Sequence, residues 1–304
     1  METRQQVSFR SGRDECAAWH YPGTNGACVV MAGGFAVPRG PGTDRFAARF
    51  HAAGYSVLAF DYRRLGDSTG EPRLVLPVSD AVADWHAALT HAATLPDVDP
   101  TRIAAWAFSM SGGHLFTVAA QHPGLAAAIA QTPNADGLAA TRNAARYQSV
   151  GALLGLVGRG VVDALGGLLG RAPLTVPTAG ARGTVAVLTT PDAADGDRAL
   201  DPDDEYSEWT RTVAARSTLS LATYRPGRDA AAVRCPLLVV VCDDDQSALA
   251  APAVAAAQRA PRGALVRLTG AHYAPFLDQH EAAVEAELDF LARALTSSTS
   301  DRSS

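Results

Sequence analysis

Residues 103–114 read IAAWAFSMSGGH, an apolar run that gives way to a serine between small residues and then to two glycines. Residues 103–108 have the length and composition of a buried strand, and the residues after Ser109 can begin a helix. A serine at such a corner projects its hydroxyl outward, while backbone N–H groups at the helix N-terminus face the group it attacks. The stretch therefore predicts a nucleophile elbow, a geometry suited to acyl transfer.

The residues around Ser109 depart from the usual elbow pattern, G-x-S-x-G. Ala107 and Ser111 occupy the two glycine positions, and Gly112 and Gly113 come next. Alanine and serine are the next smallest residues, so they nearly meet the demand for close approach of the helix and neighbouring strands. A second interpretation is that Ser109 is only a helix N-cap, which serine favours. Residues nearer the C-terminus decide between the two interpretations.

Two further strand ends carry the remaining parts of a hydrolytic site. Residues 237–241 are an apolar, β-branched strand that leads to three candidate carboxylates, Asp243, Asp244 and Asp245. Residues 264–270 form another short strand, after which a loop carries His272. A serine nucleophile needs an imidazole to take its proton and a carboxylate to orient that imidazole. The chain order Ser, Asp, His is the one expected of α/β hydrolases, and it favours a triad.

Five segments match the α/β-hydrolase superfamily in order and spacing: VVMAGGFAVPRG, FDYRRLGDSTGEPR, WAFSMSGGH, CPLLVVVCDDD and TGAHYAPF. The chain most resembles capped bacterial serine hydrolases related to dienelactone-hydrolase and cocaine-esterase-like enzymes. The resemblance implies a mostly parallel twisted sheet with helices on both faces and a helical cap insertion. Members of this branch also occur in secondary-metabolite pathways.

The resemblance implies a role for each residue of the triad. The nucleophile falls on Ser109, the base on His272, and the acid on Asp245, three residues after Cys242 at the strand end. Asp136 is an alternative acid, because some superfamily members place the acid one strand earlier.

An oxyanion hole would combine the backbone N–H groups of Met110 and Phe35. In many family members a histidine stands where this chain has Gly33. The donors are backbone groups, so the hole can survive that change. The alternative is that Gly33 and Gly34 mark only a flexible turn.

Composition excludes several function classes. The net charge is −5 without basic runs, so the electrostatic footprint of a nucleic-acid-binding protein is absent. All 26 basic residues are arginine, which excludes Schiff-base and pyridoxal-phosphate lysine chemistry and a lysine-bearing phosphate loop. A serine hydrolase needs no cofactor, and we expect none.

No metal site is expected either. The four cysteines lack C-x-x-C spacing and are typical of small buried residues in a reducing compartment. The acidic segment 192–205 lacks the EF-hand pattern and is interpreted as a solvated turn with helix-capping acids. The first residues lack the apolar core of a signal peptide, so we predict a cytoplasmic protein.

Spacing divides the chain into a core, 1–136 and 231–296, a helical cap insertion, 137–230, and a disordered polar tail, 297–304. Residues 150–170 are strongly apolar, but Arg159 and Asp163 interrupt them. We interpret them as a buried helix and not a membrane span. Aliphatic residues of the cap predict a hydrophobic acyl substrate.

The leading functional hypothesis is a serine hydrolase that cleaves an ester, thioester or lactone of a hydrophobic small molecule through an acyl-enzyme on Ser109. The first alternative keeps the fold but catalyses acyl transfer, elimination or cyclisation on a secondary-metabolite intermediate. The second is a binding module without catalysis. The sequence leaves open whether the protein is a monomer or a homodimer.

Overall fold

A computed structural model describes residues 4–296. Within them, eight strands form one twisted sheet in the order β1-β2-β4-β3-β5-β6-β9-β10. The β1–β2 and β2–β4 pairs are antiparallel, and the pairs from β4 to β10 are parallel. The strands are β1 (Gln5–Ser11), β2 (Asp14–Tyr21), β3 (Cys28–Ala32), β4 (Ser56–Phe60), β5 (Ile103–Phe108), β6 (Ala127–Gln131), β9 (Leu237–Cys242) and β10 (Gly263–Leu268).

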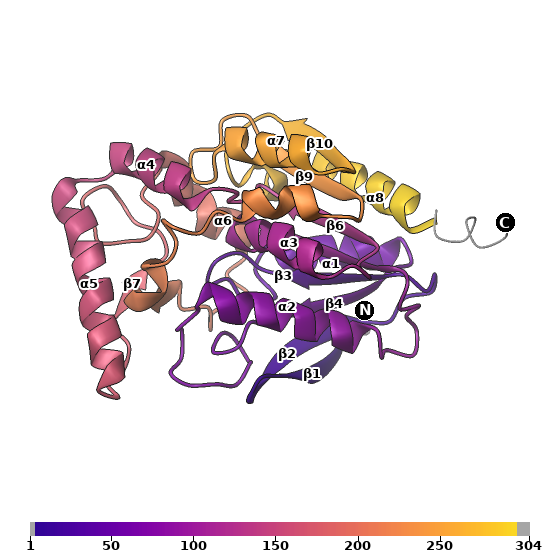
Figure 1. The fold of residues 1–304 in the computed structure, drawn as a ribbon, viewed down its shortest axis with the longest axis horizontal. Helices are drawn as coiled ribbons and strands as arrows, with labels where there is room; N and C mark the ends of the chain where they lie inside the picture. The colour runs from indigo at the N-terminus through magenta and orange to yellow at the C-terminus, as the bar shows by residue number, and fades with distance from the viewer. Residues whose placement is uncertain (1–3, 297–304) are drawn as a thin grey trace.

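Helices cover both faces of this sheet (Figure 1). They are α1 (Thr43–Ala52), α2 (Val78–Ala92), α3 (Ser109–Gln121), α7 (Ala250–Arg259) and α8 (His280–Thr296). Every residue of β5 is buried, and its side chains alternate between two hydrophobic clusters. Apolar residues of α2, α3 and α7 belong to the cluster of Ala105, and those of α1 and α8 to the cluster of Trp106. The predicted mostly parallel twisted sheet with helices on both faces is confirmed, and strands buried on both faces require such helices on both sides.

The segment between β6 and β9 begins with helices that extend beyond the sheet (Figure 1) and ends with a short helix packed against α3 and α7. It contains α4 (Gly137–Tyr147), α5 (Val150–Leu168), β7 (Thr175–Pro177), η1 (Pro191–Asp195), α6 (Gly196–Leu200), β8 (Thr212–Ala214), η2 (Ala215–Thr218) and η3 (Pro226–Ala232). Strands β7 and β8 pair with each other and not with the main sheet. A short 3-10 helix, η4 (Ala274–Phe276), comes after β10. The predicted polar tail, 297–304, lies outside the described residues.

Two expectations about this segment are wrong. Residues 150–168 do form a helix, but only Ala152, Gly160 and Asp163 of α5 are buried. The segment has no second layer of helices to cover the outer side of α5, so its apolar residues face outward. The acidic stretch 192–205 is also not simply solvated, because Asp192 and Asp201 are buried.

Candidate active site

Ser109 occupies a strained corner between β5 and α3. Its φ is +58°, in the left-handed region that L-residues rarely adopt, directly after an extended Phe108. A side chain on Gly112 would lie 3.0 Å from the Ala107 carbonyl oxygen, and one on Gly113 would collide with the Asn134 carbonyl. The two glycines after the serine thus supply the close approach that Ala107 and Ser111 still permit.

The N-cap interpretation of Ser109 does not describe this corner. The cap position of α3 is Phe108, and no side chain caps the helix there. The Ser109 hydroxyl instead lies 3.0 Å from Nε2 of His272. The serine side chain therefore points away from the helix backbone and towards an imidazole.

The structure brings Ser109, His272 and Asp245 into one hydrogen-bonded line. Nδ1 of His272 lies 2.7 Å from Oδ2 of Asp245, and the other carboxylate oxygen accepts a 2.6 Å hydrogen bond from the Ala248 N–H. The His272 and Asp245 side chains are each 1% exposed. Such burial keeps both the carboxylate orientation and the imidazole tautomer fixed, with Nδ1–H donating to Asp245 and Nε2 free to accept from the serine.

Two carboxylates raise the pKa of His272. Burial lowers the pKa of His272, but its attraction to Asp245, their hydrogen bond and the charge of Asp192 together raise it above the ordinary value. Asp192 comes from η1 in the segment between β6 and β9, and it accepts hydrogen bonds from the backbone N–H groups of Gln246 and Ser247. This segment therefore reaches the loop that carries Asp245.

Asp136 does not approach His272. Its carboxylate accepts hydrogen bonds from the Leu138 and Ala139 N–H groups at the start of α4 and pairs with Arg225 at 2.6 Å. An aspartate in this position caps a helix and offsets the positive end of its dipole. Of the two candidate acids, the structure places Asp245 beside the imidazole.

The loop after β3 is closely packed rather than flexible. A side chain on Gly33 would collide with the Val37 carbonyl, and one on Gly34 would lie 2.9 Å from the Phe108 ring. Ala36 has a φ of +57°, and its carbonyl accepts a 3.0 Å hydrogen bond from the Trp209 indole N–H. Phe35, whose N–H is the predicted oxyanion donor, follows two closely packed glycines and precedes Ala36, whose carbonyl is held by a hydrogen bond.

A buried ion pair holds the far end of the same loop. Asp61, at the end of β4, accepts a 2.6 Å hydrogen bond from the Arg39 N–H and also binds the Arg39 guanidinium. Asp67 binds the second terminal nitrogen of that guanidinium at 2.5 Å. This chain has Gly33 where many family members have a histidine, but the contacts of Arg39 with Asp61 and Asp67 hold the loop in place.

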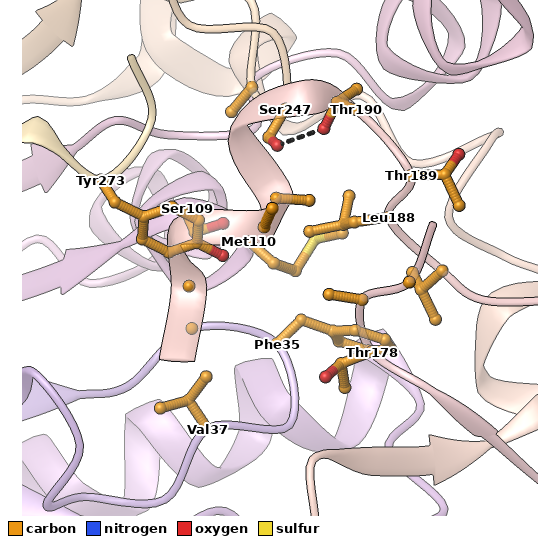
Figure 2. A pocket seen from close by; sticks show the side chains of 18 of the residues that line it. Phe35, Val37, Ser109, Met110, Thr178, Leu188, Thr189, Thr190, Ser247 and Tyr273 are labelled. Atoms are coloured by element: carbon orange, nitrogen blue, oxygen red, sulfur yellow. Dashed lines mark hydrogen bonds between the residues drawn. The ribbon is translucent and has the colours of Figure 1, made fainter. Parts of the chain in front are cut away.

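A cavity of about 690 Å³ opens in front of Ser109. Figure 2 shows Phe35, Met110, Leu188 and Tyr273 among its walls, with Thr190 hydrogen-bonded to Ser247. No residue of α5 lines this cavity, so the apolar run of α5 is not among the cap residues that could contact a hydrophobic acyl substrate. The apolar walls come from the loops and from these side chains: Phe35, Val37, Phe108, Met110, Val187, Leu188, Leu200, Trp209 and Leu221.

The sequence did not reveal Asp192 or Trp209 as parts of this site. Both lie in the segment between β6 and β9, and neither stands in a motif whose spacing relates it to Ser109. Within residues 4–296, no group of three or more His, Cys, Asp or Glu side chains is arranged to hold a metal ion. The four cysteines are buried and unbridged.

Comparisons with known proteins agree with this architecture. The family model described as serine aminopeptidase, S33, matches residues 24–272. The quorum-quenching protein AidA of Acinetobacter baumannii (strain MDR-ZJ06) is 35% identical over 291 residues, 94% of each chain. The polyketide transferase af380 of Aspergillus fumigatus is 37% identical over 119 residues, 39% of this chain and 41% of its own. The crystal structure of the α/β hydrolase GrgF from Penicillium sp. sh18 matches with a TM-score of 0.80 at 21% identity, covering 96% of this chain and 99% of its own.

Proposed function

We propose that this chain, which belongs to the serine aminopeptidase S33 family of α/β hydrolases, is a serine hydrolase that forms an acyl-enzyme on Ser109. The observation that carries the proposal is the continuous contact from the Ser109 hydroxyl, which lines the cavity, through His272 to Asp245. The S33 name describes an aminopeptidase family, and within it we assign this chain to esters, thioesters or lactones of hydrophobic small molecules.

In the first half of the reaction, Nε2 of His272 takes the proton of the Ser109 hydroxyl as its oxygen attacks the substrate carbonyl. Asp245 stabilises the imidazolium that results. The backbone N–H groups of Phe35 and Met110 face the developing oxyanion. The imidazolium then gives its proton to the leaving alcohol, thiol or ring oxygen, and the acyl group remains on the serine.

The second half repeats these steps with water. His272 takes a proton from a water molecule, whose oxygen attacks the acyl-enzyme carbonyl, and the proton returns to Ser109 as the acid leaves. No step needs a metal or a cofactor. The raised pKa of His272 means that the neutral imidazole, the form able to act as base, is lost as the pH falls through that value.

The cavity supports the choice of substrate class. Aromatic and aliphatic side chains dominate its walls, while Thr178, Thr189, Thr190 and Ser247 provide a smaller polar side. A small molecule with an apolar acyl part fits this division, with the reactive carbonyl at Ser109. We also propose that residues 137–230 act as a cap, because their loops supply much of this wall.

Acyl transfer is the second candidate. The observation in its favour is the partial match to a protein named as a polyketide transferase, together with a cavity large enough to admit an acceptor beside the acyl group. In this reaction an acceptor hydroxyl or amine replaces water in the second half. Incubating the protein with a thioester substrate, with and without added alcohols, separates the two by the ratio of ester to free acid.

The test of the proposed nucleophile uses a fluorophosphonate probe and intact-protein mass spectrometry. We expect one covalent adduct on the wild-type protein and none on the Ser109→Ala variant. Ser111→Ala is the matched control, because this serine lies two residues away and its hydroxyl accepts a hydrogen bond from the buried Tyr62 hydroxyl. Labelling of the Ser109→Ala variant, or an unlabelled wild type, would contradict the assignment.

A further inference from the structure

The outer face of α5 is an apolar surface without a partner in the described chain. Large hydrophobic side chains that are exposed number eleven within residues 4–296, and eight of them lie in residues 150–169. Leu154 is 67% exposed and Leu168 is 84% exposed. Figure 1 shows α5 at one end of the long axis of the molecule, away from the sheet. The set is Val150, Leu154, Val157, Val161, Val162, Leu165, Leu168 and Leu169.

The charged residues of α5 keep away from this face. Asp163 points inward, where it forms a two-pronged ion pair with Arg216, at 2.9 and 2.8 Å, and accepts the Leu174 N–H. Arg159 lies about 140° around the helix from the centre of the apolar face, given 100° per residue. The face itself consists of aliphatic residues and glycine, so its side chains offer water no hydrogen-bonding group.

We propose that this face is the contact between two copies of the chain, which pack α5 against α5 in an antiparallel pair centred near Gly158. The exposed fractions of its eight large residues correspond to roughly 900 Å² of apolar surface, and an ordinary stable interface needs about 800 Å² from each partner. Apolar patches larger than a few hundred Å² are rare on monomers.

The glycines of α5 favour a second helix as the occupant. Gly151 and Gly158 lie on the outer face, and a side chain at either would meet nothing within 4 Å. Each glycine costs the helix about 1 kcal/mol relative to alanine, without any gain inside this chain. The close approach of another helix backbone is the gain that such residues provide.

The spacing is also self-complementary. In an antiparallel pair centred on Gly158, position i faces a partner position whose number is 316 minus i, so Gly151 meets Leu165 of the partner subunit. The outward-facing Gly151 thus faces a large residue, which allows a side chain of one helix to fill the gap of the other.

The charges near the face fit the rim of a protein interface. Residues 137–190 contain a single acidic residue, the buried Asp163, although the chain has 31. Arg146, Arg159, Arg171 and Arg182 are exposed around α5. Arginine enrichment and depletion of acidic residues are typical of protein interfaces. Arg182 also lines the cavity, so the contact would lie near the site.

The first test measures the mass in solution by sedimentation velocity between about 0.5 and 50 µM. We expect the wild type to have the mass of two chains, and Leu154→Glu to raise the dissociation constant at least a hundredfold. Leu265→Glu is the matched control, since Leu265 is exposed on β10, outside the cap, and should leave the dimer intact. Unchanged far-ultraviolet circular dichroism shows that the variants fold. A monomeric wild type, or a dimeric Leu154→Glu variant, would overturn the proposal.

The second test probes the antiparallel arrangement by oxidation. The four native cysteines are buried and unbridged, so Gly158→Cys introduces one exposed thiol near the centre of the contact. We expect it to form a disulfide-linked dimer, whereas Leu168→Cys would hold its two thiols about 30 Å apart and stay unlinked. The reverse result would refute this geometry. Flotation with phosphatidylglycerol vesicles tests the alternative that the apolar face of α5 binds a lipid surface. A wild type that is monomeric and floats with the vesicles would contradict the dimer and favour membrane binding.

Discussion

The central sheet and α5 have similar residues but differ in burial. Strand β5, Ile103–Phe108, and helix α5, Val150–Leu168, are both rich in aliphatic and small residues. In β5 every residue is buried, because helices cover both faces of the sheet. In α5 only three residues are buried, because a single layer of the cap lies behind the helix. Apolar composition thus predicts burial only where the fold supplies a layer on each side.

The largest expected effect separates the two candidate acids, Asp245 after the sheet strand β9 and Asp136 at the start of the segment that contains α5. Asp245→Asn should lower kcat by about 10³- to 10⁴-fold, because an amide cannot orient and stabilise the imidazolium as a carboxylate does. Asp136→Asn should leave kcat within about threefold and cost less than about 1 kcal/mol of stability, because asparagine still caps the helix and only the charge paired with Arg225 is lost. Steady-state rates on a p-nitrophenyl ester and urea unfolding measure both. Loss of turnover in Asp136→Asn with an active Asp245→Asn would exchange the two roles.

The burial contrast itself can be tested on matched leucines. Leu115→Ala in α3, where the side chain is fully buried, should lower the free energy of unfolding by about 2–5 kcal/mol. Leu165→Ala in α5, where it is 58% exposed, should change it by less than about 0.5 kcal/mol. Both are measured by urea unfolding at concentrations low enough to keep the chain monomeric. Equal losses of unfolding free energy would mean that the outer face of α5 packs against the rest of the chain in solution.

Trp209→Phe sharpens the link from cap to core. The change keeps an aromatic ring in the cavity wall but removes the hydrogen bond to the Ala36 carbonyl, which holds the loop of Phe35. We expect kcat to fall about tenfold with KM within about twofold, because the loss affects the oxyanion more than the bound substrate. The inhibition constant of a trifluoromethyl ketone should rise by a similar factor. A rise in KM alone would assign Trp209 to substrate binding instead.

The smallest effect concerns Asp192. Its charge helps to raise the pKa of His272, so Asp192→Asn should lower that pKa. The neutral base then persists to lower pH, and the acid limb of the kcat/KM profile moves to lower pH with it. Initial rates measured from about pH 5 to pH 8 show the shift. Movement of the limb to higher pH would contradict this sign.

Sequence reasoning predicted the fold and the residues that meet at the serine, because both depend on local patterns. Strand ends at Phe108, Cys242 and Leu268 are visible as apolar runs that stop, and parallel strands bring their carboxyl ends to one edge of the sheet. Asp192 and Trp209 could not be predicted. Their contacts join segments about 50 and 170 residues apart, and no local periodicity records such a pairing.

The sequence by itself determined the α/β-hydrolase fold, the elbow at Ser109 and the chain order of its two partners. The physical reason is that strand burial, turn sterics and strand-end position are properties of short segments. Only the tertiary structure decided that Asp245 rather than Asp136 meets His272, that cap residues hold the loop of Phe35, and that α5 turns its apolar face outward. These depend on which surfaces find a covering layer, and a covering layer is a property of the whole fold.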